Sequence, residues 1–429
     1  METTSLVNLT PLLKVMLLGL TVACGPLAWW WLQHKSAHNQ RESQGQRIKR
    51  MQALTAFTLF LTFDLVIFGA FTRLTDSGLG CPDWPGCYGS ATPFGAKVHV
   101  DAAQAAIPTG AVTTTKAWIE MLHRYLATSV GVLILTLTLH SWWTRFTARK
   151  QAKEKVHQLS QYQLNTSLQI SPWWPTASLV WVCVVGAFGA LTVTLKLFPA
   201  IVTLHLLGAL LLLALLTRQA KHYALVTTQM SSTAHTATVP KHLQTTLIVT
   251  FALVWLQIAL GGWVSTNYAV LACDTFPVCQ KSWWPDMDFA NGFSLWRELG
   301  LTSLGENMPF SALTAIHYTH RLSAYVVFMA LGYSAWLLSK AAVSHNMPNF
   351  KRYSNWLIWL ALWQFFTGVT NAVMGWPLFA ALAHTAGAAG LVMALTWMLC
   401  KSHETSIGSS GSTQTALKKP LSFKLQHRQ

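Results

Sequence analysis

Long apolar stretches separated by short polar segments dominate the chain, and each stretch has the length that a helix needs to cross a membrane. A bilayer core about 30 Å thick takes roughly 20 apolar residues per helix, and nine stretches meet this length. They are Pro11–Leu32, Met51–Thr72, Ala117–His140, Trp174–Val193, Ala200–Leu216, Thr246–Thr266, Ala312–Leu338, Asn355–Gly375 and Leu378–Cys400. The pattern predicts an all-α polytopic membrane protein with nine helices.

The pattern also repeats, which divides the chain into two halves. Residues 69–87 read GAFTRLTDSGLGCPDWPGC and residues 261–279 read GGWVSTNYAVLACDTFPVC, at a constant offset of 192. Further on, EMLHRYLAT matches HYTHRLSAY, and TLHLLGALLLL matches LAHTAGAAGLV. Each half therefore holds four helices in the same order and orientation, which predicts two tandem four-helix bundles related by a parallel repeat.

The repeat sets the expected domain boundaries. We expect a four-helix N-terminal half over residues 51–218 and a four-helix C-terminal half over residues 246–400. Residues 1–50 stand outside the repeat as an extra transmembrane helix with a basic loop. This helix lacks an early basic region and a small-residue cleavage site before Trp29, so we expect it to be retained. Residues 401–429 are polar and basic, and are expected to form a disordered cytoplasmic tail.

The charge of the chain indicates its orientation. Only 10% of the 429 residues are charged, against about 25% in a soluble domain, and the net charge is +16. Of the 30 Lys and Arg residues, 21 fall in the segments on one side of the nine spans, six on the other side and three within spans. Because Lys and Arg in short loops stay in the cytoplasm, we expect the N-terminus on the outer face and the C-terminus inside. The basic excess is thus a signal of topology, and no nucleic-acid partner is expected.

Five histidines lie inside apolar spans, in one layer roughly 7–13 Å from the outer helix ends at a rise of about 1.5 Å per residue. They are His123, His205, His317, His320 and His384. Two helices of each half carry them, and paired imidazoles on facing helices of a four-helix bundle are typical axial ligands of haem iron. A packing role would explain one such histidine, and zinc would need three or four clustered ligands. The pattern therefore favours haem, ligated by His123, His205, His320 and His384.

Charged residues accompany these histidines. Arg124 and Arg321 directly follow a histidine in each half and are candidates to neutralise haem propionates, with snorkelling to headgroups as the alternative. Three residues before that histidine, the first half carries Glu120 and the second carries His317. A carboxylate within a membrane is a functional candidate, so Glu120 is expected to move protons or stabilise positive charge. Its alternative is a structural role, either paired with Arg124 or holding the tautomer of His123. For Asp64, the other acid in a span, packing and proton delivery both stay open.

Four cysteines form two pairs in the expected outer loops, Cys81 with Cys87 and Cys273 with Cys279. An oxidising compartment favours a disulfide in each pair. Both a structural staple and a redox role are open, because closing such a short loop stabilises only modestly. The first pair is the better redox candidate, since it belongs to the half that carries Glu120.

Together, RLTDSGLGCPDWPGC, KAWIEMLHRYLAT and the four spaced histidines on a duplicated eight-helix core resemble haem A synthase of bacterial and mitochondrial membranes. The resemblance covers about residues 51–400. It implies an enzyme that oxidises one methyl group of haem O to a formyl group, through hydroxylated intermediates, and so supplies haem A to terminal oxidases. The extra N-terminal helix departs from many members of this family.

The resemblance also implies roles for the residues. His320 and His384 would ligate a haem b cofactor, whereas His123 and His205 would flank the substrate, haem O, with Glu120 as the catalytic carboxylate. The residues favour the same division, because only the first half has a carboxylate beside its histidine.

The resemblance further implies a bacterial inner membrane location, with the Cys loops on the outer face. Expected partners are haem O, membrane lipid, a haem O synthase and oxidase assembly factors, and the chain is compatible with a homo-oligomer. One alternative is a di-haem electron-transfer cytochrome that modifies no haem, and another is a thiol oxidoreductase that uses the Cys pairs. A solute transporter is disfavoured, because the repeat is parallel rather than inverted.

Overall fold

The computed structural model describes residues 10–35, 44–154, 171–229, 240–344 and 348–410. Within these ranges nine helices are long and apolar enough to cross a membrane, which confirms the prediction of a polytopic all-α membrane protein. The nine are α1 (Thr10–Lys35), α2 (Gln44–Leu74), α4 (Thr114–Glu154), α6 (Trp173–Thr194), α7 (Pro199–Gln229), α8 (Lys241–Thr266), α10 (Phe310–Ser344), α11 (Pro348–Val373) and α12 (Leu378–Ser410).

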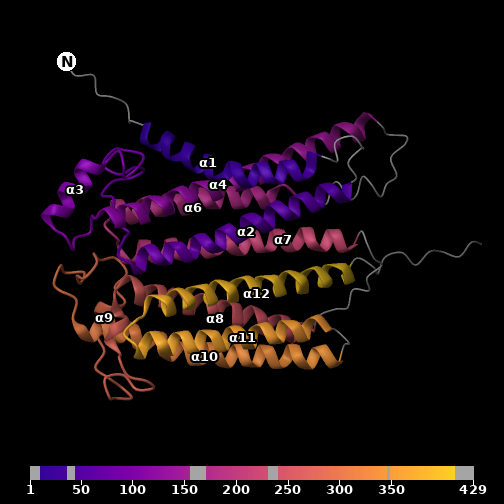
Figure 1. Cartoon of the computed structure of the whole chain (residues 1–429). Coiled ribbons are helices and arrows are strands. Elements are labelled where there is room, and N and C mark those ends of the chain that lie inside the picture. Colours follow the sequence, from indigo (N-terminus) through magenta and orange to yellow (C-terminus); the bar gives the residue numbers. More distant parts are fainter. Residues whose placement is uncertain (1–9, 36–43, 155–170, 230–239, 345–347, 411–429) are drawn as a thin grey trace, which may run out of the picture.

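The helices pack as two bundles that lie side by side (Figure 1). In the first bundle α2 packs against α4 and α7, and α6 packs against the same two helices. In the second bundle α8 and α11 pack in the same way against α10 and α12. The bundles meet through α2, α7, α8 and α12.

The extra helix α1 lies along α4, on the side of the first bundle that faces away from the second (Figure 1). The two helices approach closely at Gly19, where an added Cβ would lie 2.5 Å from Thr128. The hydroxyl of Ser129 donates to the carbonyl of Gly19 at 2.8 Å. Small residues permit such close packing of transmembrane helices, so α1 is an attached part of the first bundle.

The ends of the helices follow the repeat. Helices α2 and α8 end at Leu74 and Thr266, which differ by the sequence offset of 192. Helices α6 and α11 end at Thr194 and Val373, an offset of 179, and α7 and α12 begin at the same offset. Equivalent positions in the two halves can therefore be compared residue by residue.

Equivalent residues of the two halves meet where the bundles join. Arg73 donates a 2.6 Å hydrogen bond to the carbonyl of Ser265, its own counterpart in the second half. The hydroxyl of Tyr268 donates to Asp76, again its counterpart, at 2.5 Å. The Arg73 guanidinium also lies 4.1 Å from the centre of the Tyr268 ring. The axis that relates the two halves therefore passes between these residues.

The loops that carry α3 (Lys97–Ala106) and α9 (Phe289–Gly292) lie at the same end of the two bundles (Figure 1). A short 3₁₀ helix, η1 (Ala269–Ala272), follows α8 at this end. At the opposite end α12 continues to Ser410, so the first residues of the expected disordered tail are helical. No proline follows Cys400 before Pro420 to stop the helix at the membrane boundary. The remainder of the expected tail, 411–429, lies outside the described residues.

Candidate functional site

The structure brings the four candidate haem ligands together in two pairs, one in each bundle. His123 on α4 and His205 on α7 belong to two helices of the first bundle that both pack against α2 and α6. His320 on α10 and His384 on α12 are arranged in the same way in the second bundle, where both helices pack against α8 and α11. All four side chains are half-buried. Within the part of the chain that the structure describes, no three His, Cys, Asp or Glu side chains form a metal-binding group.

Each imidazole packs against a glycine of the neighbouring helix. An added Cβ would lie 3.0 Å from the His123 ring at Gly69, 3.1 Å from the His205 ring at Gly189, 2.9 Å from the His320 ring at Gly261 and 3.3 Å from the His384 ring at Gly368. The absence of a side chain thus lets each ring lie directly on the backbone of its neighbour. Sequence reasoning missed these glycines, although two of them recur at the offset of 192 and two at 179.

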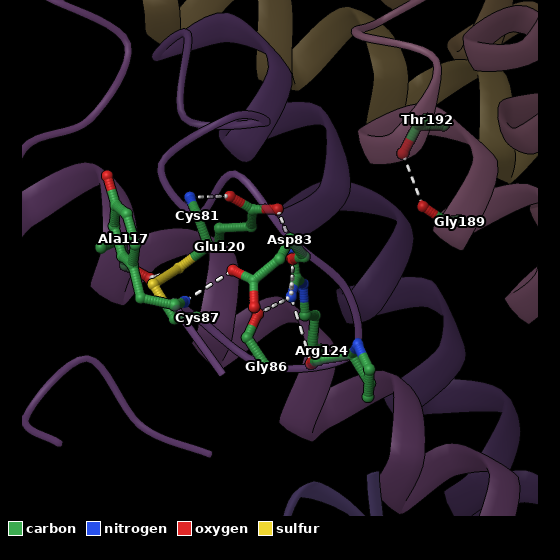
Figure 2. A network of polar contacts seen from close by, with 11 residues as sticks. Cys81, Asp83, Gly86, Cys87, Ala117, Glu120, Arg124, Gly189 and Thr192 are labelled. Carbon is green, nitrogen blue, oxygen red and sulfur yellow. Dashed lines mark hydrogen bonds and ion pairs between the residues drawn. A yellow bond between two sulfur atoms is a disulfide. The ribbon is translucent and has the colours of Figure 1, made fainter. Parts of the chain in front are cut away.

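Glu120 is buried near the N-terminal end of α4, where only 4% of its surface is exposed. One carboxylate oxygen, Oε2, accepts a 2.8 Å hydrogen bond from the backbone N–H of Cys81. The other oxygen, Oε1, forms an ion pair with Arg124, one turn further along the helix. Figure 2 shows the carboxylate held between the loop and the guanidinium. The pairing with Arg124, which sequence reasoning held as the alternative for Glu120, is therefore present.

Arg124 also binds the Cys81–Cys87 loop. Its Nη1 donates to the backbone carbonyls of Asp83 at 3.0 Å, Pro85 at 3.1 Å and Gly86 at 2.5 Å (Figure 2). A planar guanidinium can serve several acceptors at once. The side chain thus fastens the loop to the end of α4.

Arg321 does the same in the second half. Its guanidinium donates to the carbonyls of Cys273, Thr275 and Val278, and the last two are the counterparts of Asp83 and Gly86. Its Nε donates to Nε2 of His317 at 3.2 Å. This hydrogen bond is the second-half equivalent of the ion pair between Glu120 and Arg124. The structure therefore places both arginines against loop carbonyls, and their role toward haem propionates stays a prediction.

Both cysteine pairs form disulfides, Cys81 with Cys87 and Cys273 with Cys279. All four residues have no exposed surface. Each loop also forms an isolated antiparallel β-bridge, between Cys87 and Ser90 in the first half and between Cys279 and Ser282 in the second half. Exchange with an external thiol would therefore require a loop to open.

Asp64, the remaining acid of the spans, is exposed on α2. It lies ten residues before Leu74, roughly 15 Å from the end of the helix at a rise of about 1.5 Å per residue. The structure thus places it on the surface of the bundle, and it adds nothing to the cluster around Glu120.

Comparison with known proteins identifies relatives of both halves. A family model described as cytochrome oxidase assembly protein, COX15-CtaA, matches residues 52–396. The haem A synthase of Shewanella oneidensis is 33% identical over 347 residues, which cover 80% of this chain and 93% of that protein. The haem A synthases of Allorhizobium ampelinum and Bacillus licheniformis are 25% and 24% identical, over 81% and 73% of this chain and 88% and 82% of their own. The family match begins after α1.

Proposed function

Because the chain belongs to the COX15-CtaA family of cytochrome oxidase assembly proteins, we propose that it is a membrane oxidoreductase that converts haem O to haem A. Its similarity to bacterial haem A synthases supports this activity. The observation that carries the proposal is the buried carboxylate of Glu120, three residues before His123. The equivalent position in the second half is His317, so only the first bundle has a carboxylate at this place.

The first bundle is the proposed site of haem O. Two imidazoles on facing helices, His123 and His205, can take the two axial positions of an iron, and Gly69 and Gly189 leave space for both rings. Oxidation of the methyl group to a formyl group needs an external electron acceptor or activated oxygen to take the electrons, and in this proposal Glu120 accepts protons that the oxidation releases. Arg124 and the N–H of Cys81 hold the carboxylate in one position during this transfer.

The second bundle is the proposed site of a haem b cofactor, with His320 and His384 as its ligands. These residues fit the group, because both imidazoles lie in one bundle and each has a glycine beside it. When bound, haem b would supply one-electron transfer to or from the first bundle. We also assign Arg124 and Arg321 the task of providing positive charge near the haem propionates at the outer ends of the bundles.

The multi-pass architecture and the bacterial relatives support a location in the inner membrane. The distribution of Lys and Arg supports an orientation with the disulfide loops outside and the C-terminus in the cytoplasm. A haem O synthase and oxidase assembly factors are the proposed partners, because the substrate must arrive and the product must leave.

The test is to express the full chain with and without a source of haem O, purify it, and analyse the extracted haems by chromatography and mass spectrometry. We expect haem A only when haem O is supplied, together with haem b in both preparations. Two unchanged haems in both preparations would instead identify a di-haem electron-transfer cytochrome. A His123→Ala variant is the matched control, because it should lose the conversion and keep haem b.

A further inference from the structure

The residue four positions before each histidine-facing glycine differs between the two halves. In the second half it is a glutamine on both helices, Gln257 before Gly261 and Gln364 before Gly368. In the first half the equivalent positions are Leu65 before Gly69 and Val185 before Gly189. Four positions are one helical turn, so each of these side chains lies on the same helix face as its glycine.

Gln257 links α8 to the ligand of α10. Its Nε2 donates to the backbone carbonyl of His320 at 3.0 Å and lies 3.1 Å from Nδ1 of the same residue. Its Oε1 accepts a hydrogen bond from Ser323, whose hydroxyl also lies 3.0 Å from the His320 carbonyl. The backbone of His320 is therefore held by two polar side chains, and its imidazole lies in contact with the Gln257 amide.

Gln364 links α11 to the ligand of α12 in the same way. Its Nε2 donates to the backbone carbonyl of His384 at 2.8 Å. The hydroxyl of Thr367 lies 2.9 Å from Nδ1 of the same histidine. The amide has room because residue 387 is a glycine, where an added Cβ would lie 2.3 Å from Nε2 of Gln364.

The first half has apolar residues at the matching positions. Leu65 replaces Gln257 and Leu126 replaces Ser323, while Val185 and Phe188 replace Gln364 and Thr367. None of these four apolar side chains can form a hydrogen bond with the ring or the backbone carbonyl of a histidine. His205 keeps a 3.1 Å contact from Nδ1 to the backbone carbonyl of Val185, and His123 stacks on Phe68.

Water does not compete for hydrogen bonds between helices in the membrane interior, so such bonds resist the separation of two helices. A cofactor haem must stay bound through many turnovers, whereas a substrate haem must be released after each one. We infer that Gln257 and Gln364 are positioning residues that retain the haem of the second half. The side chains of Leu65 and Val185 form no such hydrogen bonds. The two histidine ligands of the first half can therefore move apart, so that haem O can bind and haem A can leave. This inference rests on the proposed function.

The test compares rates of haem loss from the purified full chain to excess apomyoglobin, with absorbance and electron paramagnetic resonance to follow the bis-imidazole haem. In a His205→Ala background, which leaves the second-half site, we expect Gln257→Leu with Gln364→Val to speed haem loss at least tenfold. Gln244→Leu, on α8 away from the ligands, is the matched control and should leave the rate unchanged. An unchanged rate and spectrum in the double variant would overturn the inference.

The reciprocal variant, Leu65→Gln with Val185→Gln, keeps the inference testable if the first variant does not fold. We expect it to slow release of the first-half haem at least tenfold, measured in a His384→Ala background that leaves only that site. Release at the parental rate would count against the inference. These rates are measured without turnover. If wild-type protein leaves haem O unchanged, the proposed function fails, whereas conversion combined with unresponsive release rates refutes only the role of the glutamines.

Discussion

The backbone N–H of Cys81 donates a 2.8 Å hydrogen bond to the carboxylate of Glu120. A residue of the disulfide therefore contacts the proposed catalytic carboxylate directly, through the backbone rather than through sulfur. Arg124 closes the arrangement, because it binds both the carboxylate and the carbonyls of the same loop. A movement of the loop at Cys81 would break this hydrogen bond, so the conformation of the loop and the position of Glu120 are linked.

Substitution of Glu120 by Gln should leave haem binding intact and remove the proton acceptor. General acid–base groups contribute about 10²–10⁴-fold to a rate, so haem A formation should fall by about this factor. Haem O or a hydroxylated intermediate should accumulate, as measured by mass analysis of extracted haems. Glu306→Gln, at an exposed position in the loop before α10, is the control. Haem A formation at the wild-type rate in Glu120→Gln would disprove the catalytic role.

Substitution of Arg321 by Lys should loosen the second disulfide loop. A lysine ammonium cannot reproduce the fork that serves three carbonyls, and hydrogen bonds to charged groups contribute about 1.5–3 kcal/mol each. We expect a loss of about 3 kcal/mol of stability, seen as a lower thermal midpoint and faster proteolysis of the loop. Arg352→Lys, on the exposed surface of α11, should change neither measurement. Equal stability of the two variants would show that the loop does not depend on Arg321.

Substitution of Gly261 by Ala should push His320 out of place, because the new Cβ would lie 2.9 Å from the ring. Overpacking of this kind destabilises by about 1–3 kcal/mol. We expect a lower haem content and an altered absorbance of the second-half haem. Gly332→Ala, on α10 with open space around the position, should keep the wild-type spectrum. A full haem content in Gly261→Ala would show that haem binding does not depend on the close contact between residue 261 and His320.

The orientation can be tested with reporters fused after residue 429. We expect a fluorescent protein at this position to fluoresce and alkaline phosphatase to be inactive, because 21 of the 30 Lys and Arg residues fall on that side. Active phosphatase would reverse the assigned orientation. Phosphatase inserted in the loop that contains α3 serves as the control and should be active.

Sequence reasoning found the features that depend on length and on matched motifs. The spans follow from apolar length, and the pairing of His123 with His205 follows from their place in a repeat. The contact between Glu120 and Arg124 was foreseen as an alternative, since residues four apart share a helix face.

Sequence reasoning missed the features that depend on which helices are neighbours. The contact of Gly261 with His320 requires α8 to lie beside α10, and no local pattern states this. The carbonyls that bind Arg321 belong to a loop whose backbone path is irregular. Gln257 reads as an ordinary polar residue in a span until its partner is known.

The contacts of Arg73 with Ser265 and of Asp76 with Tyr268 have a consequence for the origin of such a molecule. If two identical four-helix subunits associated about the same axis, each of these positions would face a copy of itself, and two arginines or two aspartates would repel. Covalent fusion of the subunits removes this constraint, because one member of each pair can mutate alone. Symmetry breaking at the axis therefore accompanies the proposed division of labour between a half for the substrate and a half for a cofactor.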